Sequence, residues 1–136
     1  MLVNLLIGTG LLIVLTLVWF LFHYKFSPHL NRPDGAARIT GTCGDTMEVR
    51  LKFEAGRVVE TSHWTDGCVY SMNCLVQAVE LARGKTPEEI LDIFPTHIER
   101  RVGGLPLDHM HCAALAVQTL HAAVDDHMQK QARPQA

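Results

Sequence analysis

The sequence lacks the basic excess that is typical of proteins that bind nucleic acids. Its 136 residues include 12 Lys and Arg against 14 Asp and Glu, which gives a formal net charge of −2. Domains that bind DNA or RNA usually concentrate Lys and Arg well above this balance. We therefore expect no nucleic-acid partner.

Cysteine and proline are also scarce. Four Cys are too few for a small domain held together by disulfides. None of them forms a Cys-x-x-Cys pair, which excludes a zinc ribbon and a thioredoxin-type site. Only six Pro and an aromatic content of 7% argue against a largely disordered chain.

Charge is absent from the first part of the chain. The run Leu2–Phe22 contains no charged residue. As a helix it measures roughly 32 Å, which is enough to cross the hydrocarbon core of a bilayer. No basic segment precedes the run and no small-residue cleavage site follows it, so we expect residues 1–26 to be an uncleaved membrane anchor. Aromatic residues cluster near its end, as at a membrane interface: Trp19, Phe20, Phe22, Tyr24 and Phe26.

Basic residues follow this run and none precedes it. Lys25, Arg32 and Arg38 are the first three cationic side chains of the chain. Because positive charge marks the cytoplasmic side of a span, we predict a single-pass membrane protein, attached through residues 2–22, with its remaining domain in the cytoplasm. Residues 27–37 contain two prolines and a glycine, which predicts a linker.

Alternating residues after the linker predict a β-hairpin. In Met47–Glu54 every second residue is apolar, which predicts a strand with one buried face and one solvent-exposed face. An Ala-Gly turn leads into a partner strand over Arg57–Thr65. With a short strand at Arg38–Thr40, these segments predict a three-stranded antiparallel sheet.

The period of the apolar residues then changes to that of helices. One helix is expected from about Val69 to Arg83, and a second begins at Thr86, where Thr-Pro-Glu-Glu forms a capping box. A third covers Thr96–Val102. The inner face of a final helix is expected to contain Ala113, Val117, Leu120 and Val124.

Strands followed by helices predict an α+β fold, in which several helices pack on one face of the small sheet. We assign this domain to residues 38–128 and expect a flexible tail at residues 129–136, where the sequence becomes polar. One transmembrane helix precedes it.

Three cysteines lie at element boundaries, where side chains from distant segments can converge. Cys43 precedes a strand, Cys68 lies between a strand and a helix, and Cys112 lies in the first turns of the last helix. Helix N-termini favour thiolates, which bind soft metals and iron–sulfur clusters. With two neighbouring side chains they form a candidate metal site: Cys43, Asp45, Cys68, His111 and Cys112.

Cys74 is expected to be a small buried hydrophobic residue. Six residues along a helix turn through roughly 600°, so Cys74 points about 120° away from Cys68, and a dithiol pair is disfavoured. For His109 two interpretations stay open, a neighbour of the metal ligands or an ordinary surface residue.

The segments around these cysteines resemble the iron–sulfur cluster assembly scaffolds of the NifU/IscU type. The similarity extends from about Asn31 to Val124. Four segments account for it: Thr42–Met47, Thr65–Cys68, Gly84–Glu89 and Leu105–Ala113. The resemblance implies an α/β sandwich with the cluster ligands at one end. The membrane anchor is an addition to the family's pattern.

The resemblance also implies roles for the candidate ligands. Cys43, Cys68 and Cys112 match the three scaffold cysteines that hold a transient [2Fe–2S] cluster. Asp45 matches an Asp that makes the cluster labile, and His111 matches the His before the last cysteine. Cys112 corresponds to the cysteine that accepts persulfide sulfur from a cysteine desulfurase.

A protein of this kind receives iron and sulfur and passes the finished cluster to apo iron–sulfur proteins. The resemblance therefore implies that the chain is not an enzyme in the turnover sense. It also implies that the site holds zinc when no cluster is present.

Two differences from the family's pattern keep other functions open. Val69 stands where the family usually has Gly after the second cysteine, and Leu105–His109 departs from the family's Leu-Pro-Pro-Val-Lys. One alternative is a relay protein that carries persulfide on Cys112 alone. The other is a zinc-stabilised, membrane-attached interaction module with a closed four-ligand site.

Overall fold

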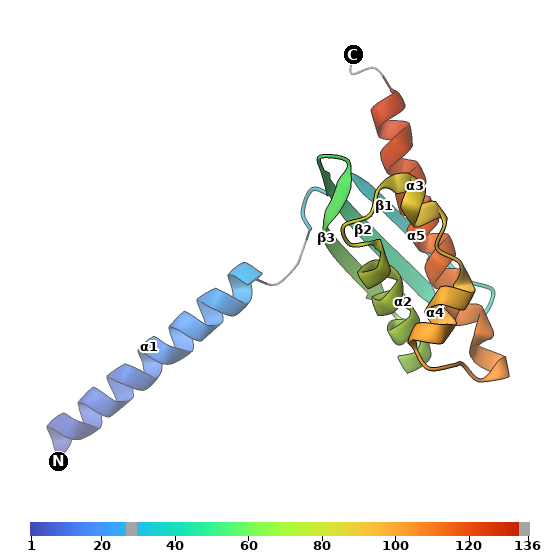
Figure 1. The fold of residues 1–136 in the computed structure, drawn as a ribbon. Coiled ribbons are helices and arrows are strands. Elements are labelled where there is room, and N and C mark those ends of the chain that lie inside the picture. The colour runs from blue at the N-terminus through green and yellow to red at the C-terminus, as the bar shows by residue number, and fades with distance from the viewer. Residues whose placement is uncertain (27–29, 134–136) are drawn as a thin grey trace.

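The structure is a computed structural model that describes residues 1–26 and 30–133. An N-terminal helix, α1 (Leu2–Phe26), precedes a domain in which strands come first and helices follow (Figure 1). The elements of this domain are β1 (Gly35–Thr40), β2 (Thr46–Glu54), β3 (Arg57–Thr65), α2 (Val69–Ala82), α3 (Pro87–Leu91), α4 (Pro95–Arg101), the 3-10 helix η1 (Leu107–His109) and α5 (Met110–Ala132). The predicted α+β fold and its order of elements are confirmed.

The three strands form one antiparallel sheet in the order β1-β2-β3. Ala55 and Gly56 join β2 to β3 with φ values of 51° and 76°, the positive values that a type I′ hairpin turn requires. A bulge between Lys52 and Phe53 shifts the register near this turn. The predicted hairpin is thus confirmed.

β1 begins at Gly35, earlier than the predicted start at Arg38. The N–H of Asp34 already donates to the carbonyl of Leu51, with an N···O distance of 2.9 Å. Gly35 also lies tight against α5, where a Cβ would come within 2.2 Å of the Ala123 carbonyl oxygen. The last residues of the predicted linker therefore belong to the sheet, because a distant helix holds them there.

α5 continues to Ala132, past the predicted start of the tail at residue 129. An ion pair one helical turn apart supports this end, since Lys130 Nζ lies 2.6 Å from Asp126 Oδ2. The remaining parts of the predicted linker and tail, residues 27–29 and 134–136, lie outside the described residues.

The core lies between the sheet and the helices. α5 packs on β1 and β2, α2 packs on β3, and α3 and α4 pack against α5 (Figure 1). The alternation of β2 buries Met47, Val49 and Leu51 completely. Burying one such side chain contributes about 1.5–3 kcal/mol. The predicted inner face of the last helix is buried: Ala113, Val117, Leu120 and Val124.

The opposite face of the sheet carries polar side chains, as the alternation of β2 predicts. Glu48 pairs with Arg38 at 3.2 Å and with Arg50 at 2.6 Å. The Arg38 guanidinium also lies 4.6 Å from the centre of the Trp64 ring. Ion pairs at a protein surface typically contribute only about 0–1 kcal/mol of stability.

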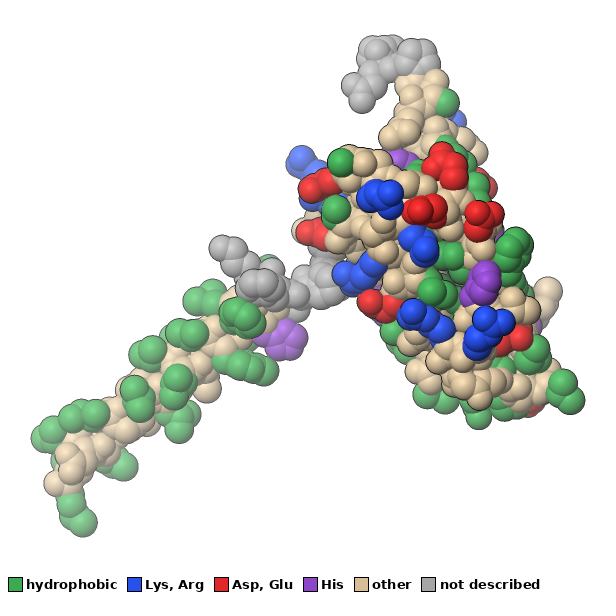
Figure 2. Space-filling model, in the orientation of Figure 1, with side chains coloured by type: hydrophobic (Ala, Val, Ile, Leu, Met, Phe, Trp, Pro, Cys, Tyr) green, Lys and Arg blue, Asp and Glu red, His purple; other side chains and the backbone are tan. Residues whose placement is uncertain are grey.

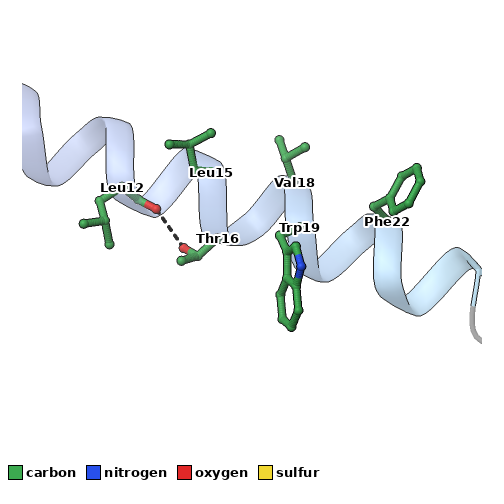
Figure 3. A pocket seen from close by; sticks show the side chains of 6 residues that line it. All are labelled: Leu12, Leu15, Thr16, Val18, Trp19 and Phe22. Carbon is green, nitrogen blue, oxygen red and sulfur yellow. Dashed lines mark hydrogen bonds between the residues drawn. The ribbon is translucent and has the colours of Figure 1, made fainter.

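α1 is long and apolar enough to cross a membrane over Leu2–Tyr24. Figure 2 shows hydrophobic side chains along its whole length. The Thr16 hydroxyl donates to the carbonyl of Leu12 at 3.0 Å, beside a shallow apolar groove lined by Leu15 and Trp19 among others (Figure 3). Polar groups satisfied within the helix are what a lipid environment requires.

Candidate metal centre

Three segments of the chain meet at one end of the sheet. Thr46 at the start of β2 lies opposite Thr40 at the end of β1, and Thr65 Oγ1 at the end of β3 donates to the Thr46 carbonyl at 2.7 Å. The first turn of α5 reaches the same end, because Cys112 Sγ lies 3.4 Å from Ser71 Oγ in α2. The loops and helix starts that carry the predicted ligands are therefore neighbours.

An Asp-Gly pair positions Cys68 beside the β1–β2 loop. Asp66 Oδ1 accepts a hydrogen bond from the Thr46 N–H at 2.7 Å, and the Asp66 N–H donates to the Thr46 carbonyl at 3.3 Å. At Gly67 a Cβ would lie 2.6 Å from Asp45 Oδ2 and 2.8 Å from Ser71 Oγ. A residue without a side chain is thus needed there for Asp45 and α2 to approach each other.

The buried hydroxyl of Ser71 connects three of the predicted ligands. Ser71 Oγ donates to Asp45 Oδ2 at 2.5 Å, and it lies 3.4 Å from Cys112 Sγ and 3.7 Å from Cys68 Sγ. In the two contacts of Ser71 Oγ with the sulfur atoms, either atom can be the donor. Ser71 is not among the site residues predicted from the sequence. Its position three residues after Cys68, on the same face of a helix, is the signal that could have found it.

Cys68, His109 and Cys112 form a compact cluster. Their ligand atoms all lie within 4.8 Å of one another. Cys68 is exposed, His109 is half-buried and Cys112 is buried. Two thiolates and an imidazole are a donor set that zinc and similar cations prefer. Of the two interpretations of His109, the structure favours the one that places it at the site.

Cys43 and His111 lie at the margin of this cluster. Cys43 is exposed in the β1–β2 loop, and it is near enough for its charge to disfavour a thiolate at Cys112. His111 is also exposed, with its Nε2 3.7 Å from Cys112 Sγ. Within the described part of the chain, the three-residue cluster includes neither of them. The structure therefore brings the five predicted ligands to one region. Of these five, Cys68 and Cys112 form the compact cluster with His109.

The two clustered cysteines have opposite pKa shifts. The backbone N–H and the hydroxyl of Ser71 hold the pKa of the Cys68 thiol below its usual range. Burial raises the pKa of the Cys112 thiol, against the effect of its hydrogen bond with Ser71. The expectation that a helix start favours a thiolate is thus confirmed for Cys68. It is wrong for Cys112, because a thiolate that is only 1% exposed loses its hydration.

Cys74 belongs to the core and not to the site. It is fully buried, and burial raises the pKa of its thiol to about 12. A neutral thiol in these surroundings packs as a small apolar side chain. The prediction made from helical spacing is confirmed.

The chain matches a known protein family. Residues 31–134 match the NifU-like N-terminal domain. This range contains β1 to β3, all the helices of the domain and every residue of the candidate site. α1 lies before it.

Two curated proteins illustrate the similarity. The chain is 35% identical over 116 residues to the iron–sulfur cluster assembly scaffold protein IscU 1 of Archaeoglobus fulgidus, covering 78% of this chain and 76% of that protein. It is 31% identical over 104 residues to iron–sulfur cluster assembly protein 3 of Arabidopsis thaliana, covering 74% of this chain and 60% of that protein.

A solved structure has a similar fold. The crystal structure of a nitrogen-fixing NifU-like protein (N-terminal) from Brucella abortus superimposes with a TM-score of 0.56, covering 74% of this chain and 83% of that one. At 19% sequence identity, this likeness supports the fold alone.

Proposed function

The chain belongs to the family of the NifU-like N-terminal domain, and from this membership we propose that it is a scaffold for iron–sulfur cluster assembly. The relatives named above as assembly proteins support this role. The observation that carries the proposal is the convergence of Asp45, Cys68 and Cys112 around the Ser71 hydroxyl, at 2.5, 3.7 and 3.4 Å.

In this proposal Cys112 accepts sulfur from a cysteine desulfurase. The Cys112 thiolate attacks the outer sulfur of the desulfurase persulfide, a new S–S bond forms on Cys112, and the desulfurase cysteine leaves as a thiolate. Because burial raises the pKa of the Cys112 thiol, its proton must leave first. His111 Nε2, 3.7 Å from Cys112 Sγ, is in position to take that proton.

Thiolates of Cys43, Cys68 and Cys112 then hold a [2Fe–2S] cluster, with Asp45 as the exchangeable ligand. Iron(II) and an external reductant, a thiol or a small electron-transfer protein, supply the electrons that convert the delivered sulfur to sulfide. A carboxylate is a harder donor than a thiolate and binds cluster iron less firmly, so Asp45 favours release of the cluster to apo iron–sulfur proteins. In this role the chain is the site on which the cluster is assembled, and it does not catalyse repeated turnover as an enzyme does. Without a cluster, the site holds zinc.

The proposal also includes a membrane attachment. The length and composition of α1 support a single span, and the basic residues that follow it favour a cytoplasmic domain. A scaffold attached in this way assembles clusters at the membrane surface.

The test is anaerobic reconstitution of the full chain in detergent micelles with iron(II), cysteine and a cysteine desulfurase. Visible absorption and Mössbauer spectra should show a [2Fe–2S] cluster in the wild type. Cys112→Ala should abolish it and Asp45→Ala should prolong its lifetime. Cys74→Ala is the matched control, because it removes a buried thiol outside the site, and it should form the cluster normally.

Two other results would contradict the scaffold function. A protein that keeps one zinc ion per chain and stays colourless throughout reconstitution with iron(II) and sulfur would support the zinc-stabilised interaction module. Persulfide on Cys112 without colour, unaffected by Cys43→Ala or Asp45→Ala, would support the sulfur relay.

A further inference from the structure

We propose that the outer face of the sheet, opposite the face on which α2 and α5 pack, lies on the membrane surface and binds its anionic phosphate headgroups. This orientation rests on the proposed attachment through α1, and it adds the surface of the domain that meets the bilayer. It follows from where the chain enters the domain, from the length of chain before that point, and from the side chains around it.

The chain enters the domain at the middle of the outer face. Arg50 is the fifth of the nine residues of β2, the central strand, and it alternates with the buried Val49 and Leu51. Its side chain therefore points to the outer face. There Arg50 Nη1 donates to the Leu30 carbonyl at 3.3 Å. Leu30 is itself only 6% exposed, so the domain holds it near the centre of this face.

Hydrogen bonds of Asp34 fix the chain between Leu30 and β1. The Asp34 N–H donates to the Leu51 carbonyl at 2.9 Å, and Asp34 Oδ2 accepts from the Phe53 N–H at 2.8 Å. Leu30 and the residues after it are thus part of the domain. The connection from the anchor ends at Leu30, although the sequence pattern predicts a linker as far as residue 37.

This connection is short. Residues 27–29 alone separate Leu30 from the end of α1 at Phe26. Consecutive Cα atoms are about 3.8 Å apart, so Leu30 lies within roughly 15 Å of the end of α1 whatever path the chain takes. A domain of this size has a radius of gyration of about 13 Å, and it is therefore wider than the connection is long. A domain held so closely by the middle of one face turns that face to the bilayer.

Trp64 gives the outer face a residue that is typical of membrane interfaces. In the sheet register it lies opposite Glu48, and it is 45% exposed. The Arg38 guanidinium lies 4.6 Å from the centre of its ring. Trp is enriched where membranes meet water, because its ring is amphipathic. Arg suits a neighbouring phosphate group, which its planar guanidinium binds through two parallel hydrogen bonds.

The outer face also carries an excess of positive charge. Glu48 pairs with Arg38 at 3.2 Å and with Arg50 at 2.6 Å, so two guanidinium groups share one carboxylate. The three cross-strand rows around Arg50 hold three cations and two carboxylates: Arg38, Glu48, Arg50, Lys52 and Glu60. This excess attracts anionic headgroups only weakly. Because the domain is already attached to the membrane, a weak attraction is sufficient to keep the face in place.

This orientation also places the candidate metal centre relative to the membrane. The centre lies at one end of the strands, so a sheet that lies on the bilayer keeps it at the level of the membrane surface. A cluster assembled there is within reach of apo-proteins of the same membrane.

The experiment measures how close Trp64 lies to lipid. The full chain with Trp19→Phe is reconstituted in vesicles of phosphatidylcholine and phosphatidylglycerol, with or without lipids brominated near the headgroup. Since the sequence contains two Trp, Trp64 is then the lone fluorophore of this kind. Its emission should fall about twofold with brominated lipid, because an interfacial ring contacts the bromine atoms. The loss should be smaller in vesicles of phosphatidylcholine alone, which lack anionic headgroups.

The matched control moves the fluorophore to the helical side of the domain. Arg100 is exposed on α4, which packs on α2 and α5. Arg100→Trp, in a chain that also carries Trp19→Phe and Trp64→Phe, should keep its emission in brominated vesicles. Equal quenching at the two positions would overturn the proposed orientation, because no single face would then meet the membrane. Unquenched Trp64 would overturn it as well.

A pair of charge variants tests the headgroup contact. Arg50→Gln and Arg101→Gln each remove one cation, the first from the outer face and the second from α4. Arg50→Gln should reduce the quenching of Trp64, and Arg101→Gln should leave it unchanged. Equal effects would contradict a contact made by the outer face. If Arg50→Gln does not fold, Lys52→Gln makes the same comparison on the same face.

Flotation of the vesicles and cluster reconstitution in the same preparations separate this orientation from the proposed function. A chain that floats with the vesicles while Trp64 stays unquenched contradicts the orientation alone. Quenched Trp64 without any cluster contradicts the scaffold function alone. A chain that does not float contradicts the attachment through α1, and the orientation with it.

Discussion

Ser71 is the residue that connects Asp45 with both clustered thiols. Its hydroxyl donates to Asp45 Oδ2 at 2.5 Å, and it lies 3.4 Å from Cys112 Sγ and 3.7 Å from Cys68 Sγ. Hydrogen bonds to charged groups are stronger than those between neutral groups, so the bond to the Asp45 carboxylate is a strong one. A single buried hydroxyl thus contacts three of the candidate ligands.

The opposite pKa shifts of the two clustered cysteines predict different alkylation profiles. A thiolate is the reactive form, so Cys68 should reach half of its maximal rate at lower pH than Cys112. Rates at each cysteine, mapped by mass spectrometry against pH, measure these midpoints independently of accessibility. Ser71→Ala removes the hydroxyl hydrogen bond and should move the Cys68 midpoint to higher pH. A Cys112 midpoint at or below that of Cys68 would contradict the assignment.

At the scale of elements, α3 shows how far local sequence specifies structure. Thr86 Oγ1 accepts from the Glu89 N–H at 3.3 Å, and Glu89 Oε2 accepts from the Thr86 N–H at 2.9 Å. The Thr86 N–H also holds the pKa of the Glu89 carboxyl below its usual range. Every group in this capping box lies within one turn, and for that reason its sequence pattern predicts it correctly.

Removing the cap should destabilise the domain without changing its fold. Thr86→Ala should lower the free energy of unfolding by about 1 kcal/mol, because the Glu89 N–H loses its acceptor. Urea unfolding followed by Trp64 fluorescence, with Trp19→Phe as the background, measures the effect as a lower midpoint at an unchanged slope. Thr86→Ser keeps the hydroxyl and should match the wild type. Equal losses in both variants would indicate that packing, and not the cap, is responsible.

β1, in contrast to α3, depends on contacts with a segment far away in the sequence. Its early start at Gly35 depends on α5, where Asp126 Oδ2 accepts from the Ala36 N–H at 3.0 Å. No residue near Gly35 in the sequence signals this contact. The sequence pattern therefore predicts too short a strand, because the first pairings of β1 are supported by a helix at the other end of the chain.

At the scale of the whole molecule, the proposed orientation places the candidate site in the cytoplasm. Cys43 is exposed, so a membrane-impermeant maleimide should label it only after cells are permeabilised. A Leu2→Cys variant supplies the control, because its new thiol lies at the other end of the span and should be labelled in intact cells. Labelling of Cys43 in intact cells would reverse the orientation. Recovery of the whole chain in the soluble fraction would contradict the anchor.

The features that depend on neighbouring residues could be predicted from the sequence alone. The apolar run of α1, the hairpin of β2 and β3, the capping box at Thr86 and the buried position of Cys74 all follow from local patterns of period or spacing. The cysteine motifs were also sufficient to indicate the family, since each motif is a contiguous segment.

Which side chains meet depends on the packing of elements that are distant in the sequence. Ser71 and Cys112 lie 41 residues apart in the chain, and their contact depends on how α2 and α5 pack on the sheet. The same packing places His109 beside Cys68, and it buries Cys112 enough to raise the pKa of its thiol. Contacts and burial of this kind arise from elements far apart in the sequence, so no local pattern contains them.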